Sequence, residues 1–219
     1  MKIDIQGIKE KLSEMTVLVA NMYKDAITSL TVHDEALALE VIERDALADK
    51  LEWRIDDMCL KFLARYAPKA AELRFVVAIL RLIIELERIG DHSKVMARQV
   101  AKFHLAPTLK SLPQFQEIAI LPFQMLNEAM DAFLAGRADR FRILEKTDQT
   151  VGALQKSLNE SLVALIKKDT DRTGAAISLI NIIRRLERVA DHAKNIAEMA
   201  PYVTDGAVVK GQANENHGH

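Results

Sequence analysis

The 219-residue chain is poor in cysteine, glycine and proline, and its charges almost balance. The single Cys59 excludes an internal disulfide framework, suits a reducing compartment, and is predicted to be a small core residue. Eight glycines and five prolines favour long uninterrupted helices over sheets and turns. Thirty basic and thirty-one acidic residues leave a net charge of −1, so nothing in the overall charge points to a nucleic-acid partner.

Long apolar runs are missing as well. Residues 1–5 lack the apolar region of a signal peptide. No stretch reaches the roughly 18 consecutive apolar residues of a membrane span. The longest candidate, 75–86, is interrupted by Arg81 and Glu85. We therefore predict a cytoplasmic protein.

Apolar residues recur at helical spacing over most of the chain, and turn residues divide the pattern. Asp34 is the expected cap of the second helix, Pro68 and Gly136 mark breaks, Pro122 should kink its helix or mark its start, and the last helix should stop near Pro201. The expected helices span about 8–30, 35–66, 69–103, 114–135, 139–168 and 173–200. The prediction is an all-α protein of two tandem three-helix bundles, 1–106 and 107–203, followed by a disordered tail, 204–219.

The two halves carry related sequences, which indicates an internal duplication. The hexapeptide ERIGDH at 87–92 nearly recurs as ERVADH at 187–192, 100 residues later. Asn21 and Asp25 in the first expected helix are matched by Asn127 and Asp131 in the fourth. Each half therefore repeats one three-helix unit, with the acidic motif late in its third helix.

The repeated motif places two carboxylates four residues apart, hence on one face of a helix. Glu87 and Asp91 continue an apolar stripe, so they lie beside the face that meets other helices. A like-charged pair at this spacing costs an isolated helix roughly 0.2–0.5 kcal/mol. A bound cation, a shared proton or a basic partner would offset that cost.

The second expected helix offers matching acids. Asp45 and Asp49 begin a row that continues on one face as Glu52 and Asp56. If this helix packs antiparallel to the next, Asp45 and Asp49 come opposite the Glu-xxx-Asp pair of the first half. Four carboxylates on facing helices form the oxygen-rich arrangement that helical bundles use to bind metal. Asn21 and Asp25 are candidate additions.

The second half has fewer of these acids. Asp148 is present, but Gly152 stands four residues on, where the first half has its second acid. The predicted metal ligands there are Asp148, Glu187 and Asp191, with Asn127, Glu128 and Asp131 as candidate additions.

The acids also admit roles that need no metal. A row of acids on one helix face is most often solvated, and Arg88, Lys94, Arg188 and Lys194 are available as ion-pair partners. His92 and His192 lie about 140° round the helix from the glutamates and are expected to pack or to support ligands rather than to bind the same metal. Trp53, the only tryptophan, is expected to be buried by packing.

The doubled Glu-Arg-(Ile/Val)-x-Asp-His motif, at the end of the third helix of each unit, resembles the PhoU family. Residues 72–74 (ELR) and 195–198 (NIAE) resemble the same family, and the likeness covers about 8–203. It implies a non-enzymatic, often dimeric regulator of phosphate uptake and of the phosphate-starvation response. The implied partners are the ATPase subunit of a phosphate ABC transporter and a sensor histidine kinase, so membrane association would be indirect.

The resemblance also implies metal sites. It assigns Asp45, Asp49, Glu87 and Asp91 to one cluster and Asp148, Glu187 and Asp191 to the other, with iron, multinuclear in some members, or another cation bound. Oxygen ligation alone leaves Fe, Mn, Mg and Zn open. Two alternatives remain: a carboxylate-bridged di-metal enzyme, or a metal-free helical scaffold, including an accessory protein of another phosphate carrier. The lack of histidines placed as in a di-iron Glu-x-x-His site argues against the di-metal enzyme. The sequence also shows no glycine-rich phosphate loop and no nucleophile with an obvious base.

Overall fold

A computed structural model describes residues 4–205 of the chain. These residues form long helices and contain no strand. The helices are α1 (Ile5–Val32), α2 (Glu35–Tyr66), α3 (Ala70–Ala97), α4 (Ala106–Leu109), α5 (Phe115–Ala135), α6 (Phe141–Lys168) and α7 (Thr173–Asp205), with 3-10 turns at Ala138–Arg140 and Thr170–Arg172. The all-α prediction is confirmed.

Local capping explains several helix ends. The Asp34 carboxylate accepts a hydrogen bond from the Leu37 backbone N–H at 2.9 Å, so Asp34 is the predicted N-cap of α2. Helix α2 ends at Tyr66, and its C-cap Ala67 takes a left-handed conformation just before Pro68. Gly136 ends α5 with a φ of 65°, a conformation that glycine adopts without a side-chain clash.

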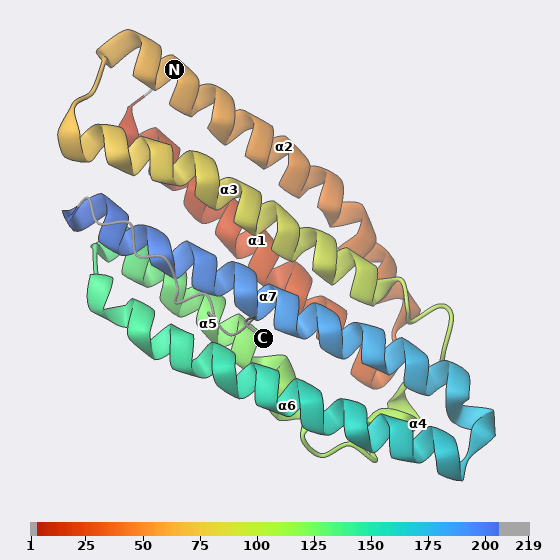
Figure 1. The fold of residues 1–219 in the computed structure, drawn as a ribbon. Coiled ribbons are helices and arrows are strands. Elements are labelled where there is room, and N and C mark those ends of the chain that lie inside the picture. Colours follow the sequence, from red (N-terminus) through yellow and green to blue (C-terminus); the bar gives the residue numbers. More distant parts are fainter. Residues whose placement is uncertain (1–3, 206–219) are drawn as a thin grey trace, which may run out of the picture.

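The six long helices form two three-helix units that lie side by side along their length (Figure 1). Helices α3 and α7 pack against each other between the units, and α1 also contacts α5. Helices α2 and α6 lie at the two outer edges. The buried apolar residues of both units belong to one hydrophobic cluster, so each unit helps to bury the other.

The α1–α5 contact contains a polar link. Pro122 lies inside α5 and is not its start. A proline within a helix disturbs the backbone hydrogen bonds of the preceding turn. The Tyr23 hydroxyl donates to the Ala119 carbonyl in that turn at 2.7 Å, and burial raises the pKa of Tyr23. Helix α1 thus supplies a donor beside the proline.

Several predicted helix ends were wrong. Helix α3 stops at Ala97, because the following turn uses tighter bonds such as Gln99 N–H to Met96 O and Val100 N–H to Ala97 O. Helix α7 continues through Pro201 to Asp205, where Arg74 of α3 reaches the Val203 carbonyl at 3.4 Å. The predicted tail therefore begins with helical residues, and its remainder, 206–219, lies outside the described part of the chain.

Two predictions about single residues have opposite outcomes. Cys59 is fully buried as predicted, and burial raises the pKa of its thiol to about 12. Trp53 was expected to pack but is 76% exposed. It lies on α2, which is one of the two outer edge helices (Figure 1).

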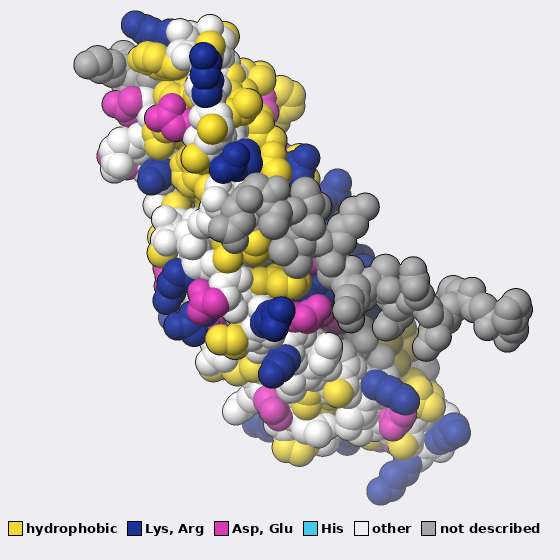
Figure 2. All heavy atoms as spheres, turned by 60° about the vertical axis from the view of Figure 1, so that its left-hand side comes forward, with side chains coloured by type: hydrophobic (Ala, Val, Ile, Leu, Met, Phe, Trp, Pro, Cys, Tyr) yellow, Lys and Arg dark blue, Asp and Glu magenta, His cyan; other side chains and the backbone are white. Residues whose placement is uncertain are grey.

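Hydrophobic side chains also reach the surface between charged ones on the face seen in Figure 2. Within residues 4–205, no helix has an apolar stretch long enough to cross a membrane.

Candidate functional site

In the first unit, a lysine joins the acids of two facing helices. Lys94 Nζ of α3 forms an ion pair with Asp45 of α2, and lies 3.0 Å from Asp91 Oδ1 one turn earlier on its own helix. Asp45 is buried. The predicted approach of Asp45 to the end of α3 is therefore confirmed, and the structure supplies a basic partner for it.

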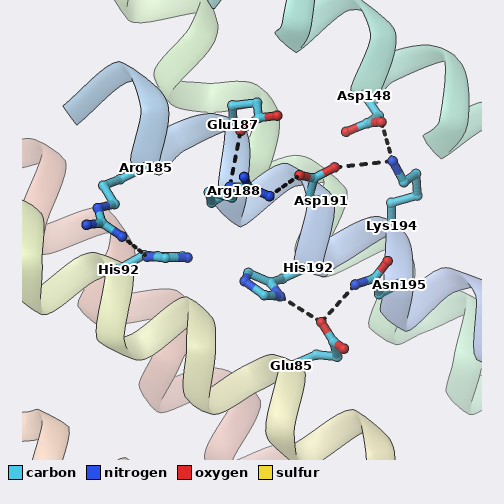
Figure 3. A network of polar contacts seen from close by, with 10 residues as sticks. All are labelled: Glu85, His92, Asp148, Arg185, Glu187, Arg188, Asp191, His192, Lys194 and Asn195. Atoms are coloured by element: carbon cyan, nitrogen blue, oxygen red, sulfur yellow. Dashed lines mark hydrogen bonds and ion pairs between the residues drawn. The ribbon is translucent and has the colours of Figure 1, made fainter. Parts of the chain in front are cut away.

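The second unit repeats this arrangement (Figure 3). Lys194 Nζ of α7 lies 2.5 Å from Asp148 Oδ2 of α6 and 3.3 Å from Asp191 Oδ1. Arg188 adds a contact of 3.5 Å to Asp191. Asp45, Asp91 and Lys94 thus correspond to Asp148, Asp191 and Lys194. We call each set a lysine bridge.

The two motif glutamates lie one turn before the lysine bridges, and neither forms an ion pair with a lysine of the described chain. Glu87 is half-buried, and its nearest basic group is Arg88, with Nε 3.6 Å from Oε2. Burial, followed by repulsion from Asp91, raises the pKa of Glu87 to about 7. Burial and Asp191 likewise raise the pKa of Glu187.

The first unit has additional acids around its glutamate. Burial and Asp45 raise the pKa of Asp49, while burial and Asp49 raise the pKa of Glu52. Both acids also act on Glu87. We call Asp49, Glu52, Glu87 and Asp91 the acidic patch. Its members repel one another, so bringing a cation to the patch would lower its electrostatic energy.

The donor chemistry of this patch fits a hard cation, but the described side chains do not converge on one. Among residues 4–205, no group of three or more His, Cys, Asp and Glu side chains is arranged to hold a metal ion. Lys94 and Lys194 already contact one motif aspartate each. The predicted ligation by the seven acids consequently stays a prediction, and it would require these side chains to move closer together.

The candidate additional ligands are directed elsewhere. Asp25 pairs with Arg44 at 2.5 Å, and Glu128 pairs with Arg140 at 3.3 Å. The Asn127 amide donates to the Phe123 carbonyl of its own helix. Asn21 is exposed on α1.

A polar network between the two units was not found from the sequence. Glu85 Oε2 of α3 lies 2.7 Å from His192 Nδ1 and 3.1 Å from Asn195 Nδ2, both on α7 (Figure 3). In the opposite direction, Arg185 Nη1 of α7 lies 3.4 Å from His92 Nδ1 of α3. Glu85 and Arg185 occupy equivalent positions in the two repeats and carry opposite charges. This difference was the signal in the sequence that could have indicated a contact between the units.

The two motif histidines meet at the centre of this network, with ring centroids 5.3 Å apart. Burial, with contributions from His192 and Arg185, lowers the pKa of His92 to about 4, so the ring is neutral at pH 7. The contacts support the prediction that His92 and His192 have a packing role. The repeated motif therefore uses Glu and Asp toward the outer helix of its own unit and His toward the other unit.

A surface depression of about 340 Å³ adjoins the network. It lies between α3 and α7, and Glu85 and Asn195 are part of its lining. Arg81 stacks over the Tyr202 ring on the same surface, with its guanidinium carbon 5.7 Å from the ring centroid. The depression extends the α3–α7 contact to the molecular surface.

The chain is a duplicated helical-bundle protein. It consists of two fused three-helix units, each with a lysine bridge, and a polar network joins the units. The PhoU domain family model matches the chain twice, over residues 12–100 and 118–200. The chain belongs to the PhoU family.

The chain aligns with named members of the family over most of their length. The chain is 32% identical to the phosphate-specific transport system accessory protein PhoU homolog of Pseudomonas aeruginosa, over 94% of this chain and 86% of that protein. It is 30% identical to phosphate-specific transport system accessory protein PhoU of Escherichia coli, over 93% of this chain and 84% of that protein.

Solved structures agree with these matches. The crystal structure of PhoU from Pseudomonas aeruginosa superposes with a TM-score of 0.84 at 31% identity, covering 93% of this chain and 98% of that one. The phosphate transport system regulatory protein PhoU from Streptococcus pneumoniae gives a TM-score of 0.84 at 25% identity, with 95% and 100% covered. This is a family of accessory and regulatory proteins, and the chain is not an enzyme.

Proposed function

We propose that this chain is a cytoplasmic regulator of phosphate-specific transport that restrains phosphate uptake and the phosphate-starvation response when phosphate is plentiful. The observation that carries the proposal is the match of both three-helix units, over nearly the whole chain, to proteins named as accessory or regulatory components of phosphate transport. As an adaptor, the chain would bind the ATPase subunit of a phosphate ABC transporter and a sensor histidine kinase, and would itself form a homodimer.

Deletion and pull-down experiments test this function. In phosphate-rich medium, deletion of the gene should raise phosphate uptake and switch on a phosphate-starvation reporter, and the full chain should restore repression. The purified chain should retain the ATPase subunit or the kinase in a pull-down. Normal repression in the deletion strain, together with no retention of either partner, would contradict the proposal.

We propose a cation site in each unit, the first at the acidic patch together with Asp45. Asp49, Glu52 and Glu87 all have raised pKa values caused by burial and by neighbouring carboxylates, and a bound cation would relieve that repulsion. Asp45, Asp49, Glu87 and Asp91 would provide oxygen ligands in the first unit, and Asp148, Glu187 and Asp191 in the second. Iron, including a cluster, manganese, magnesium or zinc is compatible with oxygen ligation.

Elemental analysis of anaerobically purified protein tests the cation site. Glu87→Ala with Asp91→Ala should remove most of the bound metal, whereas Glu187→Ala with Asp191→Ala should remove less, because that unit has Gly152 in place of an acid. Chelation followed by reloading with Fe²⁺ or Mn²⁺ provides the control. Metal-free protein under every loading condition would contradict the site.

A metal-free scaffold is the second candidate. Its support is the pair of lysine bridges, which already neutralise one buried or half-buried aspartate on each outer helix. Under this alternative, full repression should survive chelation and the Glu87→Ala, Asp91→Ala substitutions. An accessory role beside another phosphate carrier would be visible as a pull-down of that carrier in place of the ABC transporter.

A further inference from the structure

A groove of about 450 Å³ runs between α1 and α2 on the outer side of the first unit. Leu18, Leu47 and Leu51 form its apolar surface. Lys11, Lys50 and Arg54 line its rim, with Glu14 as the single acid among the lining residues. The groove is thus a leucine surface with a mainly basic border.

Two of the three cations of the basic border, Lys50 and Arg54, are not neutralised within the described chain. Lys11 pairs with Glu14, but neither Lys50 nor Arg54 forms an ion pair with a residue of the described part. Both side chains are exposed on α2. They are consequently available to carboxylates of another molecule.

Trp53 stands between these two cations in sequence and is 76% exposed. Burying such a side chain at an interface would remove a large apolar area from water, and tryptophan and arginine are enriched among the residues that dominate binding energy. Arg54 lines the groove and is its expected anchor, whereas Trp53 is not a lining residue and would contact a bound partner beside the groove.

The second unit shows that the fold does not require these residues. Its α5 and α6 correspond to α1 and α2 through the matched pairs Asn21–Asn127 and Asp45–Asp148. In that register, Lys11, Lys50, Trp53 and Arg54 are replaced by Glu117, Ala153, Lys156 and Ser157. The basic rim and the exposed indole are therefore specific to the first unit, although both units fold alike.

We propose that the α1–α2 groove binds an acidic amphipathic helix of a partner protein. A groove between two helices accepts a third helix whose apolar stripe faces it, and acids flanking that stripe would pair with Lys50 and Arg54. An anionic membrane fits less well, because the same outer helix also exposes Glu43 and Asp57.

The test uses the full chain and the fluorescence of its only tryptophan. The probe is a synthetic helical peptide with leucines at i, i+3 and i+7 and flanking glutamates, and the control peptide has lysines in place of the glutamates. We expect a saturable blue shift of Trp53 emission with the acidic peptide and about a tenfold weaker response with the basic one. The response should also weaken as salt is raised.

Charge reversal locates the site. Lys50→Glu with Arg54→Glu should weaken acidic-peptide binding by about tenfold or more, while Ala153→Glu with Ser157→Glu, at the matching exposed or half-buried positions of α6, should leave it unchanged. Equal responses to both peptides, equal binding by both double variants, or no saturable response overturns the proposal.

Two further arms identify other occupants. A Trp53 shift with phosphatidylcholine–phosphatidylglycerol vesicles but not with the peptide would make the groove a membrane surface. A shift that follows protein concentration without any addition would make it a contact between two copies. Either result overturns the acidic-helix proposal.

The inference deepens the proposed function by naming a partner-binding surface, and the two fail separately. If wild-type protein retains the transporter ATPase subunit or the kinase and the Lys50→Glu, Arg54→Glu variant retains it equally, only the groove proposal fails. If wild-type protein retains neither while the peptide still binds, the proposed function fails and the groove stands.

Discussion

The two units have the same lysine bridge but differ in the acids around it. Lys94 and Lys194 each join an aspartate of the outer helix to the motif aspartate of their own helix. Asp49, however, corresponds to Gly152, so only the first unit has a second acid on its outer helix at this position. The shared bridge belongs to the fold, whereas the added acids increase electrostatic repulsion in the first unit.

Removal of a bridge lysine should have the largest effect on stability. Lys94→Met leaves Asp45, whose side chain is 13% exposed, without its cation, and we expect the free energy of unfolding to fall by about 3 kcal/mol. Lys194→Met should cost less, about 2 kcal/mol, because fewer acids surround Asp148. Urea denaturation measures both.

The exposed pair Lys61–Asp57 provides a matched control, since Lys61→Met removes a lysine at the surface of α2. It should change stability by less than about 0.5 kcal/mol. Equal costs for Lys94→Met and Lys61→Met would show that the bridge is not needed for the fold.

The two sides of the polar network between the units should differ in how much a substitution lowers stability. Glu85→Gln weakens contacts to His192 and Asn195, and we expect a loss of about 1–2 kcal/mol. Arg185→Met loses one long contact to His92 and should cost about 0.5 kcal/mol. Thermal unfolding of both variants measures the difference. A larger cost for Arg185→Met would show that the His92 contact, and not the Glu85 contacts, is the stronger side of the polar network.

Glu87→Gln should stabilise the protein in a pH-dependent way. The pKa of Glu87 is about 7 in the folded protein, above its ordinary 4.5, so the folded state binds the proton more tightly. The stabilising effect of the protonated group is complete below about pH 4.5 and is lost as pH rises through 7. The glutamine variant should therefore be more stable by about 1 kcal/mol at pH 8 and equal to wild type near pH 4.

Unfolding curves at several pH values measure this gain, with Glu187→Gln as the counterpart. Added Mn²⁺ should stabilise the wild type more than Glu87→Gln if the acidic patch binds cations. A gain that is independent of pH would contradict the raised pKa.

Substitution of Gly152 should have a small, stabilising effect. A Cβ at this position would meet no atom within 4 Å, so Gly152→Ala should gain about 0.5–1 kcal/mol from helix propensity alone. Gly152→Asp restores the acid of the first unit, and repulsion should offset that gain. Calorimetry with Mn²⁺ would show whether the added acid also raises cation affinity in the second unit.

Much of the fold followed from local patterns. Apolar periodicity located the six long helices, and Asp34 and Gly136 begin or end helices through their own side-chain or backbone chemistry. The approach of Asp45 to the end of α3 followed from the antiparallel order of short-linked helices. The extension of α7 beyond Pro201 did not follow from local patterns. It coincides with a contact from Arg74, which is distant in the sequence.

The sequence by itself determined the helical class, the duplication and the acids of each repeat, because spacing along a helix is a local property. Tertiary structure decided which groups neutralise those acids, which residues join the units and which side chains stay exposed. Lys94, Glu85 and Trp53 are ordinary residues of amphipathic helices until the neighbouring helices are placed. Their roles depend on distances between segments that helix periodicity does not encode.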